Sequence, residues 1–146
     1  MGFSRILVGT DGSATADKAV ETAAELARQL GAELHIVTAY RASGGGLGQA
    51  TGAALAETGV GEGLQHEAAR QIAEKAVATW GGGLTTRAHA ASGSAADAIL
   101  EVAGSCDADL VVVGSKGMHG ARRVLGSVPN SVAHGAGCSV LVVKTD

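Results

Sequence analysis

The chain has 146 residues, of which 46% are hydrophobic and 17% charged, and its formal net charge is −3. This length suits one domain with a sizeable core, and the acidic balance argues against a general nucleic-acid binder, which is normally basic. No stretch approaches the roughly 18 consecutive apolar residues of a membrane helix, and the N-terminus has no apolar signal region. We therefore expect a cytoplasmic protein that binds neither nucleic acid nor a membrane.

The first part of the chain predicts two strands joined by a helix. Residues Phe3–Gly9 form an apolar run that is typical of a strand covered on both faces. A helix follows, with Ser13 as its N-cap and Gly31 at its end, and Glu33–Tyr40 predicts the second strand. Residues Arg41–Gly63 are rich in glycine and keep no helical or strand period. We expect a flexible segment there, either a disordered tether or a lid over a ligand.

The rest of the chain continues the alternation of helices and strands. These elements are expected at Leu64–Trp80 (helix), Leu84–Ala91 (strand), Ala95–Ala103 (helix), Asp109–Val113 (strand), Val128–Ala136 (helix) and Cys138–Val143 (strand). Such alternation predicts a single α/β domain over residues 1–146, Rossmann-like, with an open parallel five-stranded sheet and helices on both faces. Ligands of these sheets bind beyond the carboxyl ends of the strands, where the strand order reverses. If the strands ending at Gly9 and Gly114 are neighbours, their loops form one site.

A phosphate site is indicated where the fourth strand ends. The strand breaks into Gly114-Ser115-Lys116-Gly117, and eight residues later Gly126-Ser127 opens the next helix. Glycines let the backbone bare its amides to an anion, and a helix N-terminus favours a phosphate. Arg122 and Arg123 add positive charge between the two motifs. Two simpler interpretations stay open, in which Ser127 is a plain N-cap and Gly117 an ordinary turn residue.

The end of the first strand offers a second polar loop, Gly9-Thr10-Asp11-Gly12-Ser13. An aspartate at this position either binds a ribose hydroxyl or a metal, or braces its own loop by accepting backbone amides. The loop lacks the G-x-G-x-x-G pattern of dinucleotide-binding folds, and the chain has no P-loop motif. The chain is therefore not a P-loop NTPase, and a dinucleotide-binding fold of that kind is not expected.

Four segments together resemble the universal stress protein family over essentially the whole chain. They are Ile6–Ser13, Asp109–Gly117, Leu125–Asn130 and Cys138–Val143. The resemblance implies a five-stranded sheet of order 3-2-1-4-5, usually a homodimer, with ATP bound in many members. The last strand, with Val140, Leu141, Val142 and Val143, is expected to pair with a second copy if it lies at the sheet edge. If that strand is central, its apolar character needs no partner.

ATP-binding members of the family carry the pattern G-x2-G-x9-G-[ST]. Gly114, Gly117, Gly126 and Ser127 match it, except that Met118–Leu125 supplies eight residues in place of nine. The resemblance therefore implies an adenine nucleotide, with ATP as the first choice and AMP or cyclic AMP as alternatives. The shortened spacer leaves the preferred number of phosphates open.

The resemblance also assigns roles to individual residues. Asp11 would bind the ribose, and the Val37 backbone would meet the adenine together with Gly9 and Thr10. Lys116 would either neutralise phosphate or remain a solvated side chain. The ribose and phosphates would be lined by Gly114, Ser115, Lys116, Gly117, Met118, His119 and Gly120, and the terminal phosphates would be held by Gly126, Ser127 and Val128.

We expect a regulatory binding module and no catalytic residues. Phosphoryl transfer needs a positioned nucleophile and usually a magnesium ligand, and Asp11 is the carboxylate that these loops supply. No protein side chains are expected to bind a metal, so any Mg²⁺ would arrive with the nucleotide. A slow ATPase or phosphotransferase, and a nucleotide-free interaction protein, are the alternatives.

Overall fold

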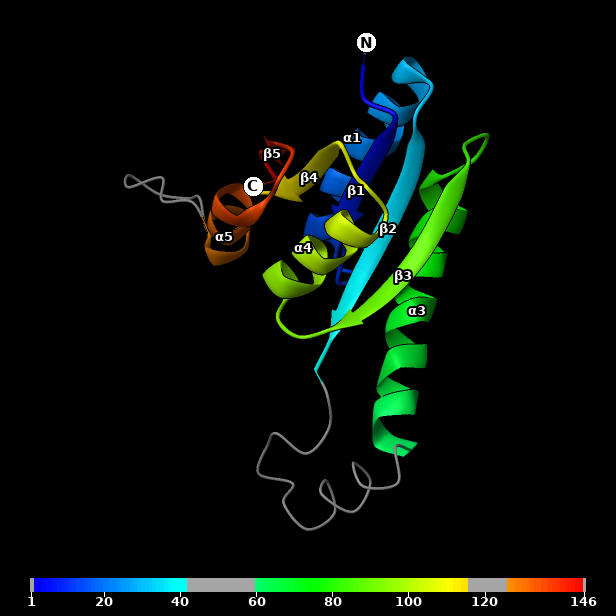
Figure 1. Ribbon diagram of the computed structural model, residues 1–146. Helices are drawn as coiled ribbons and strands as arrows, with labels where there is room; N and C mark the ends of the chain where they lie inside the picture. Colours follow the sequence, from blue (N-terminus) through cyan, green and yellow to red (C-terminus); the bar gives the residue numbers. More distant parts are fainter. Residues whose placement is uncertain (1, 42–59, 116–125, 146) are drawn as a thin grey trace.

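The computed structural model describes residues 2–41, 60–115 and 126–145, and within these ranges the chain forms one parallel sheet wrapped by helices (Figure 1). The strand order is β3-β2-β1-β4-β5, and every neighbouring pair is parallel. Both the fold class and the expected strand order are therefore confirmed. The elements are β1 (Arg5–Gly9), α1 (Ala14–Leu30), β2 (Glu33–Tyr40), α3 (Val60–Trp80), β3 (Thr86–Ser92), α4 (Ala95–Ser105), β4 (Leu110–Gly114), α5 (Ser127–Gly135) and β5 (Ser139–Val143).

Local sequence signals explain where the first elements begin and end. The side chains of Ile6, Leu7 and Val8 are fully buried, as expected for a strand covered on both faces. Ser13 caps α1, because its hydroxyl accepts the Ala16 N–H at 3.1 Å. Gly31 ends the helix in the left-handed conformation, with φ of 68°. The predicted start and end of this helix are confirmed.

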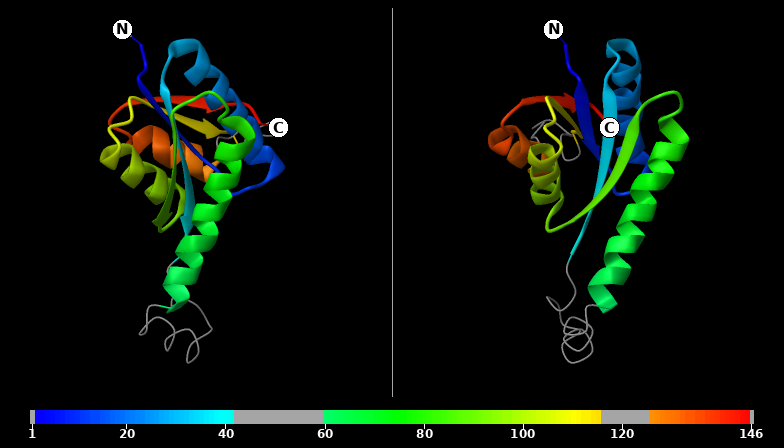
Figure 2. Two further views of the ribbon diagram at one scale, coloured as in Figure 1. Left: turned by 90° about the vertical axis from the view of Figure 1, so that its right-hand side faces the viewer. Right: turned by 45° about the vertical axis from the view of Figure 1, so that its right-hand side comes forward.

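Helices cover both faces of the sheet (Figure 2), and an apolar layer packs between the helices and the sheet on each face. Helices α1 and α3 cover one face, where Leu34 and Ile36 of β2 point. Helices α4 and α5 cover the other face, where Val37 of β2 and Leu7 of β1 point. Alanines dominate α1 on its buried side, and their small side chains let the helix approach the strands closely. The scarcity of large aromatic side chains thus has a structural reason.

The element boundaries differ from expectation by one or two residues in several places, and the start of α3 differs most. Helix α3 begins at Val60, four residues before the predicted start at Leu64. Strand β3 begins at Thr86, two residues after the predicted start at Leu84. Residues 42–59, which make up most of the segment expected to be flexible, lie outside the described residues. Whether they form a tether or a lid stays a prediction.

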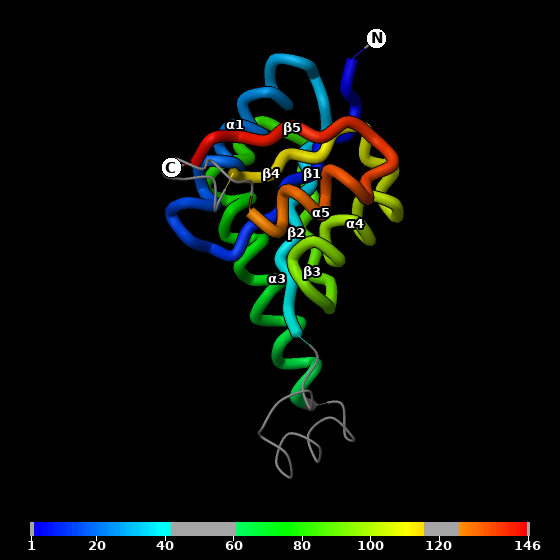
Figure 3. The backbone as a smooth tube through the Cα atoms, turned by 90° about the vertical axis from the view of Figure 1, so that its left-hand side faces the viewer, coloured from blue at the N-terminus to red at the C-terminus, as the bar shows by residue number. Residues whose placement is uncertain are grey.

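Strand β5 lies at one edge of the sheet, and among the described residues it pairs with β4 alone (Figure 3). The alternative in which this strand is central is therefore wrong. The side chain of Leu141 is 37% exposed on this edge. On the opposite side of β4, the Asp109 carboxylate accepts the N–H groups of Ser4 at 2.8 Å and Arg5 at 3.0 Å, which fixes β1 beside β4.

Candidate functional site

A pocket of about 530 Å³ opens at the carboxyl ends of β1, β2 and β4. The strand order reverses between β1 and β4, which is where ligands of open α/β sheets bind. The predicted adjacency of these two strands is confirmed. We call this cavity the strand-end pocket. Its described lining consists of Gly9, Thr10, Asp11, Ser13, Thr15, Ala16, Ala19, Val37, Ala39, Ala95, Ile99, Val113, Gly114, Gly126, Ser127, Val128, Pro129 and Thr145.

Hydrogen bonds within the chain shape the loop that follows β1. The Thr10 N–H donates to the Val37 carbonyl at 2.9 Å, which ties the loop to β2. The Gly12 N–H donates to the Thr10 hydroxyl at 3.0 Å, and the Ser13 N–H donates to the Asp11 carboxylate at 2.9 Å. Asp11 thus braces its own loop, as one of the two interpretations expected. The same side chain is exposed at the pocket, so the ribose role stays a prediction.

Gly9 and Gly114 lie in the pocket wall, but their missing side chains are explained by packing. A Cβ atom on Gly9 would come within 2.8 Å of the Ile99 Cδ1 atom of α4. A Cβ atom on Gly114 would come within 2.9 Å of the Thr145 methyl group. Packing within the protein therefore accounts for the absence of side chains at Gly9 and Gly114. Their expected contacts with a nucleotide stay predictions.

Ser115 is buried next to the pocket residue Gly114 and is absent from the described lining. Its N–H donates to the Val143 carbonyl at 2.8 Å, and its hydroxyl accepts the Thr145 N–H at 3.1 Å. These bonds attach the chain after β4 to the chain after β5. For Ser115 the structure thus describes a packing role, and its expected contact with a nucleotide stays a prediction.

Helix α5 points its N-terminus at the pocket. Gly126 is the cap residue, and Ser127 is the first helical residue. The interpretation of Ser127 as the N-cap is therefore wrong. Pro129 lies in the first turn, where a missing N–H costs nothing. The amides of the first turn and the positive end of the helix dipole favour an anion at this rim.

Five of the predicted site residues lie outside the described part of the chain, as do Arg122 and Arg123 of the shortened spacer. Their contacts with a nucleotide stay predictions. The five are Lys116, Gly117, Met118, His119 and Gly120.

Some pocket residues were missed by the sequence interpretation. Ile99 and Ala95 of α4 reach the pocket because α4 packs across β1 and β2. Both were expected only as residues of the helix Ala95–Ala103, and no sequence signal separates an apolar core residue from an apolar pocket residue. Thr145 follows the last strand, where the sequence gives no motif.

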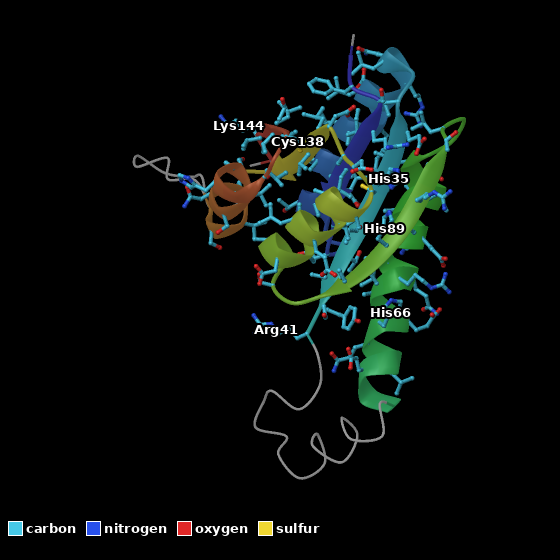
Figure 4. The ribbon with its side chains drawn as sticks, viewed as in Figure 1. His35, Arg41, His66, His89, Cys138 and Lys144 are labelled. Carbon is cyan, nitrogen blue, oxygen red and sulfur yellow. The ribbon has the colours of Figure 1, made fainter. Side chains whose placement is uncertain are left out.

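A second polar cluster lies on β2 and β3, away from the strand-end pocket (Figure 4). His35 is 4% exposed. Its Nδ1 atom lies 2.9 Å from His89 Nε2, and its Nε2 atom lies 3.1 Å from Glu33 Oε1. Since an ionised carboxylate can only accept, the His35 Nε2–H donates to Glu33, and the other ring nitrogen of His35 faces His89 Nε2. Burial lowers the pKa of His89, and His35 and Arg87 lower it further. His35 therefore packs inside the protein.

Other chemistry was searched for within the described ranges. They contain no group of three or more His, Cys, Asp or Glu side chains arranged to hold a metal ion. None of the described helices combines the length and apolar character needed to cross a membrane. Burial raises the pKa of both the Cys106 and Cys138 thiols, which fits half-buried packing residues.

Comparison with known proteins decides the family. The family model described as "Universal stress protein family" matches residues 2–144. The chain belongs to the universal stress protein family. A universal stress protein of Mycobacterium tuberculosis (strain CDC 1551 / Oshkosh), MT1672, is 34% identical over 149 residues, which cover 98% of this chain and 97% of that protein.

Solved structures of universal stress proteins share the fold. A universal stress protein in complex with cAMP is 30% identical, with a TM-score of 0.67 and full coverage of both chains. The universal stress protein from Archaeoglobus fulgidus in complex with dAMP is 23% identical, with a TM-score of 0.61 and coverage of 99% of this chain and 100% of that one. The second likeness bears on the fold alone. This universal stress protein therefore has solved relatives along its whole length.

Proposed function

We propose that this universal stress protein is a regulatory module that binds an adenine nucleotide in the strand-end pocket. The observation that carries the proposal is the convergence of the loop after β1 and the N-terminus of α5 on one cavity at the reversal of strand order. This arrangement offers a polar loop and an anion-binding helix end to a single ligand. A family member in complex with cAMP, 30% identical to this chain, supports the choice of an adenine nucleotide.

Different parts of the pocket lining suit the base, the sugar and the phosphates of a nucleotide. Val37, Ala39 and Ile99 form an apolar side that suits the adenine ring. Asp11 lies at the mouth, where its carboxylate would accept a ribose hydroxyl. The first-turn amides of α5, at Ser127 and Val128, would bind phosphate oxygens. In this proposal the segment Gly114–Gly120 would line the ribose and phosphates.

We infer that binding, and not catalysis, is the main activity. Asp11 is the only carboxylate in the described pocket lining, and that lining contains no histidine, lysine or arginine. Phosphoryl transfer needs a positioned base or nucleophile and a metal, so any hydrolysis of ATP would be slow. Mg²⁺ would be supplied with the nucleotide. The protein would act in the cytoplasm and pass its nucleotide state to a partner protein.

The ligand preference tests the proposal. Isothermal titration of the purified protein with ATP, ADP, AMP and cyclic AMP should reveal binding by at least one of them, and we expect ATP first. The eight-residue spacer Met118–Leu125 is where the preferred phosphate number would be set. Failure of all four nucleotides to bind would contradict the proposal. Turnover of ATP at about 1 per second or faster would favour the enzyme alternative.

We also propose that two copies associate through β5. The strand is an edge with an exposed leucine, and an apolar edge strand is normally covered. Leu141→Lys would place a charge in that contact, so the variant should elute as a monomer in size-exclusion chromatography with light scattering. Leu64→Lys, at a leucine that is 67% exposed on α3, is the matched control and should not change the mass. An unchanged dimer in the Leu141 variant would place the interface elsewhere.

A further inference from the structure

We propose that the hydroxyl of Thr145 is a hydrogen-bonding group for the sugar–phosphate part of the bound nucleotide. The inference rests on the proposed nucleotide binding and assigns a specificity residue to the same site. Thr145 follows β5 and belongs to none of the motifs that identify the family in this chain. Its place in the pocket wall comes entirely from tertiary structure.

The backbone of Thr145 is held firmly on both sides. Its N–H donates to the Ser115 hydroxyl at 3.1 Å, and its carbonyl accepts the Lys18 ammonium at 3.0 Å. Its side chain packs on the bare Cα of Gly114. Contacts from α1 and from the end of β4 thus fix this residue at the pocket.

These contacts use the backbone N–H and carbonyl of Thr145 and give its hydroxyl no partner. The residue is 3% exposed, and its Oγ1 atom has no hydrogen-bond partner among the described residues. A buried hydroxyl without a partner is costly, so such a group in a native protein calls for an explanation, such as a bound water, an ion or a functional role. The hydroxyl of Thr145 differs from that of Thr38 in lining the pocket, which offers it a ligand as the partner. Rotation about the single Cα–Cβ bond moves a threonine hydroxyl between staggered positions, so a ligand oxygen in the pocket can be met without moving the backbone.

The position of Thr145 selects the part of the nucleotide. Strands β1 and β4 lie between β2 and β5. Neighbouring strands are about 4.8 Å apart, so the apolar side formed by Val37 and Ala39 is on the order of 14 Å across the sheet from the end of β5. Thr145 instead lies against Gly114 at the end of β4, the strand that leads toward the N-terminus of α5. The sugar–phosphate part of the nucleotide, and not its base, would therefore meet the hydroxyl.

Replacing Thr145 with valine tests the inference, because valine keeps the shape and removes the hydroxyl. In isothermal titration Thr145→Val should bind AMP about tenfold more weakly, while its affinity for free adenine stays unchanged. Without ligand, its Tm should rise by about 3 °C, since an unpartnered buried hydroxyl is gone. Thr145→Ser should bind AMP like the unaltered protein.

Thr38 supplies the matched control. Its hydroxyl is also buried and unpartnered among the described residues, but Thr38 is absent from the described lining of the pocket. Thr38→Val should raise the Tm and leave AMP binding unchanged. This inference would be overturned if Thr145→Val and the unaltered protein bound AMP with equal affinity, or if the Tm of Thr145→Val were lowered. Either result would leave the proposed function standing. If the unaltered protein bound no adenine nucleotide, the proposed function would fail and this inference with it.

Discussion

Ser127→Glu is expected to weaken ATP binding by between about 10-fold and 100-fold. The residue is exposed at the first position of α5, beside the amides proposed for phosphate. A carboxylate about 5 Å from a phosphate charge is repelled by about 3 kcal/mol at an effective dielectric near 20, and solvent screening reduces this value. Isothermal titration at low and high salt measures the loss, which should shrink as salt rises.

The same substitution separates a phosphate effect from damage to the fold. Glutamate in the first turn of a helix interacts favourably with the helix dipole, so thermal unfolding should show equal or slightly higher stability. The affinity for adenosine, which has no phosphate, should be unchanged. Ser127→Ala provides the neutral control, because it keeps the backbone amides and adds no charge. Equal loss of adenosine and ATP binding would mean that the phosphates do not lie at α5.

Gly9→Val is expected to lower the free energy of unfolding by about 1–3 kcal/mol through overpacking. A Cβ atom at this position would lie 2.8 Å from Ile99 Cδ1 and 3.0 Å from Ile99 Cγ1, and Ile99 is itself 4% exposed. Chemical denaturation measures the change. Gly137→Val is the control, because a Cβ there meets nothing within 4 Å, and its effect should stay within about 0.5 kcal/mol.

A second substitution at Ile99 tests whether this contact is the cause. Ile99→Ala alone should cost about 2–5 kcal/mol, because it leaves a cavity. In the double variant the new valine fills part of that space, so the total loss should fall below the sum of the two single losses by about 1–3 kcal/mol. Strict additivity would show that Gly9 is required for some reason other than its contact with α4.

The sheet and its helices could be predicted closely because their signals are local. The apolar run of β1 predicts a buried strand, and the capping residues Ser13 and Gly31 predict the two ends of α1; each signal spans only a few residues. The start of α3 could not be predicted from local signals, since Gly61 and Gly63 each destabilise a helix by about 1 kcal/mol relative to alanine. Tertiary packing overrides that local preference, as the burial of Ala69 and Ala73 further along α3 illustrates.

Some features of the candidate site could likewise be predicted from the sequence, and others depend on the tertiary structure. The short motifs of the sequence determined the family, and the resemblance to that family implied the order of the strands. The sequence also indicated the two loops that meet at the pocket, because glycines, the D-G-S turn and the helix start are short-range patterns. Only the tertiary structure decided which atoms fill the space beside Gly9 and Gly114, and that Thr145 belongs to the pocket wall. These contacts join residues 30 or more positions apart, as Ser115 and Thr145 do. Close packing sets them, and packing depends on the whole fold and not on local spacing.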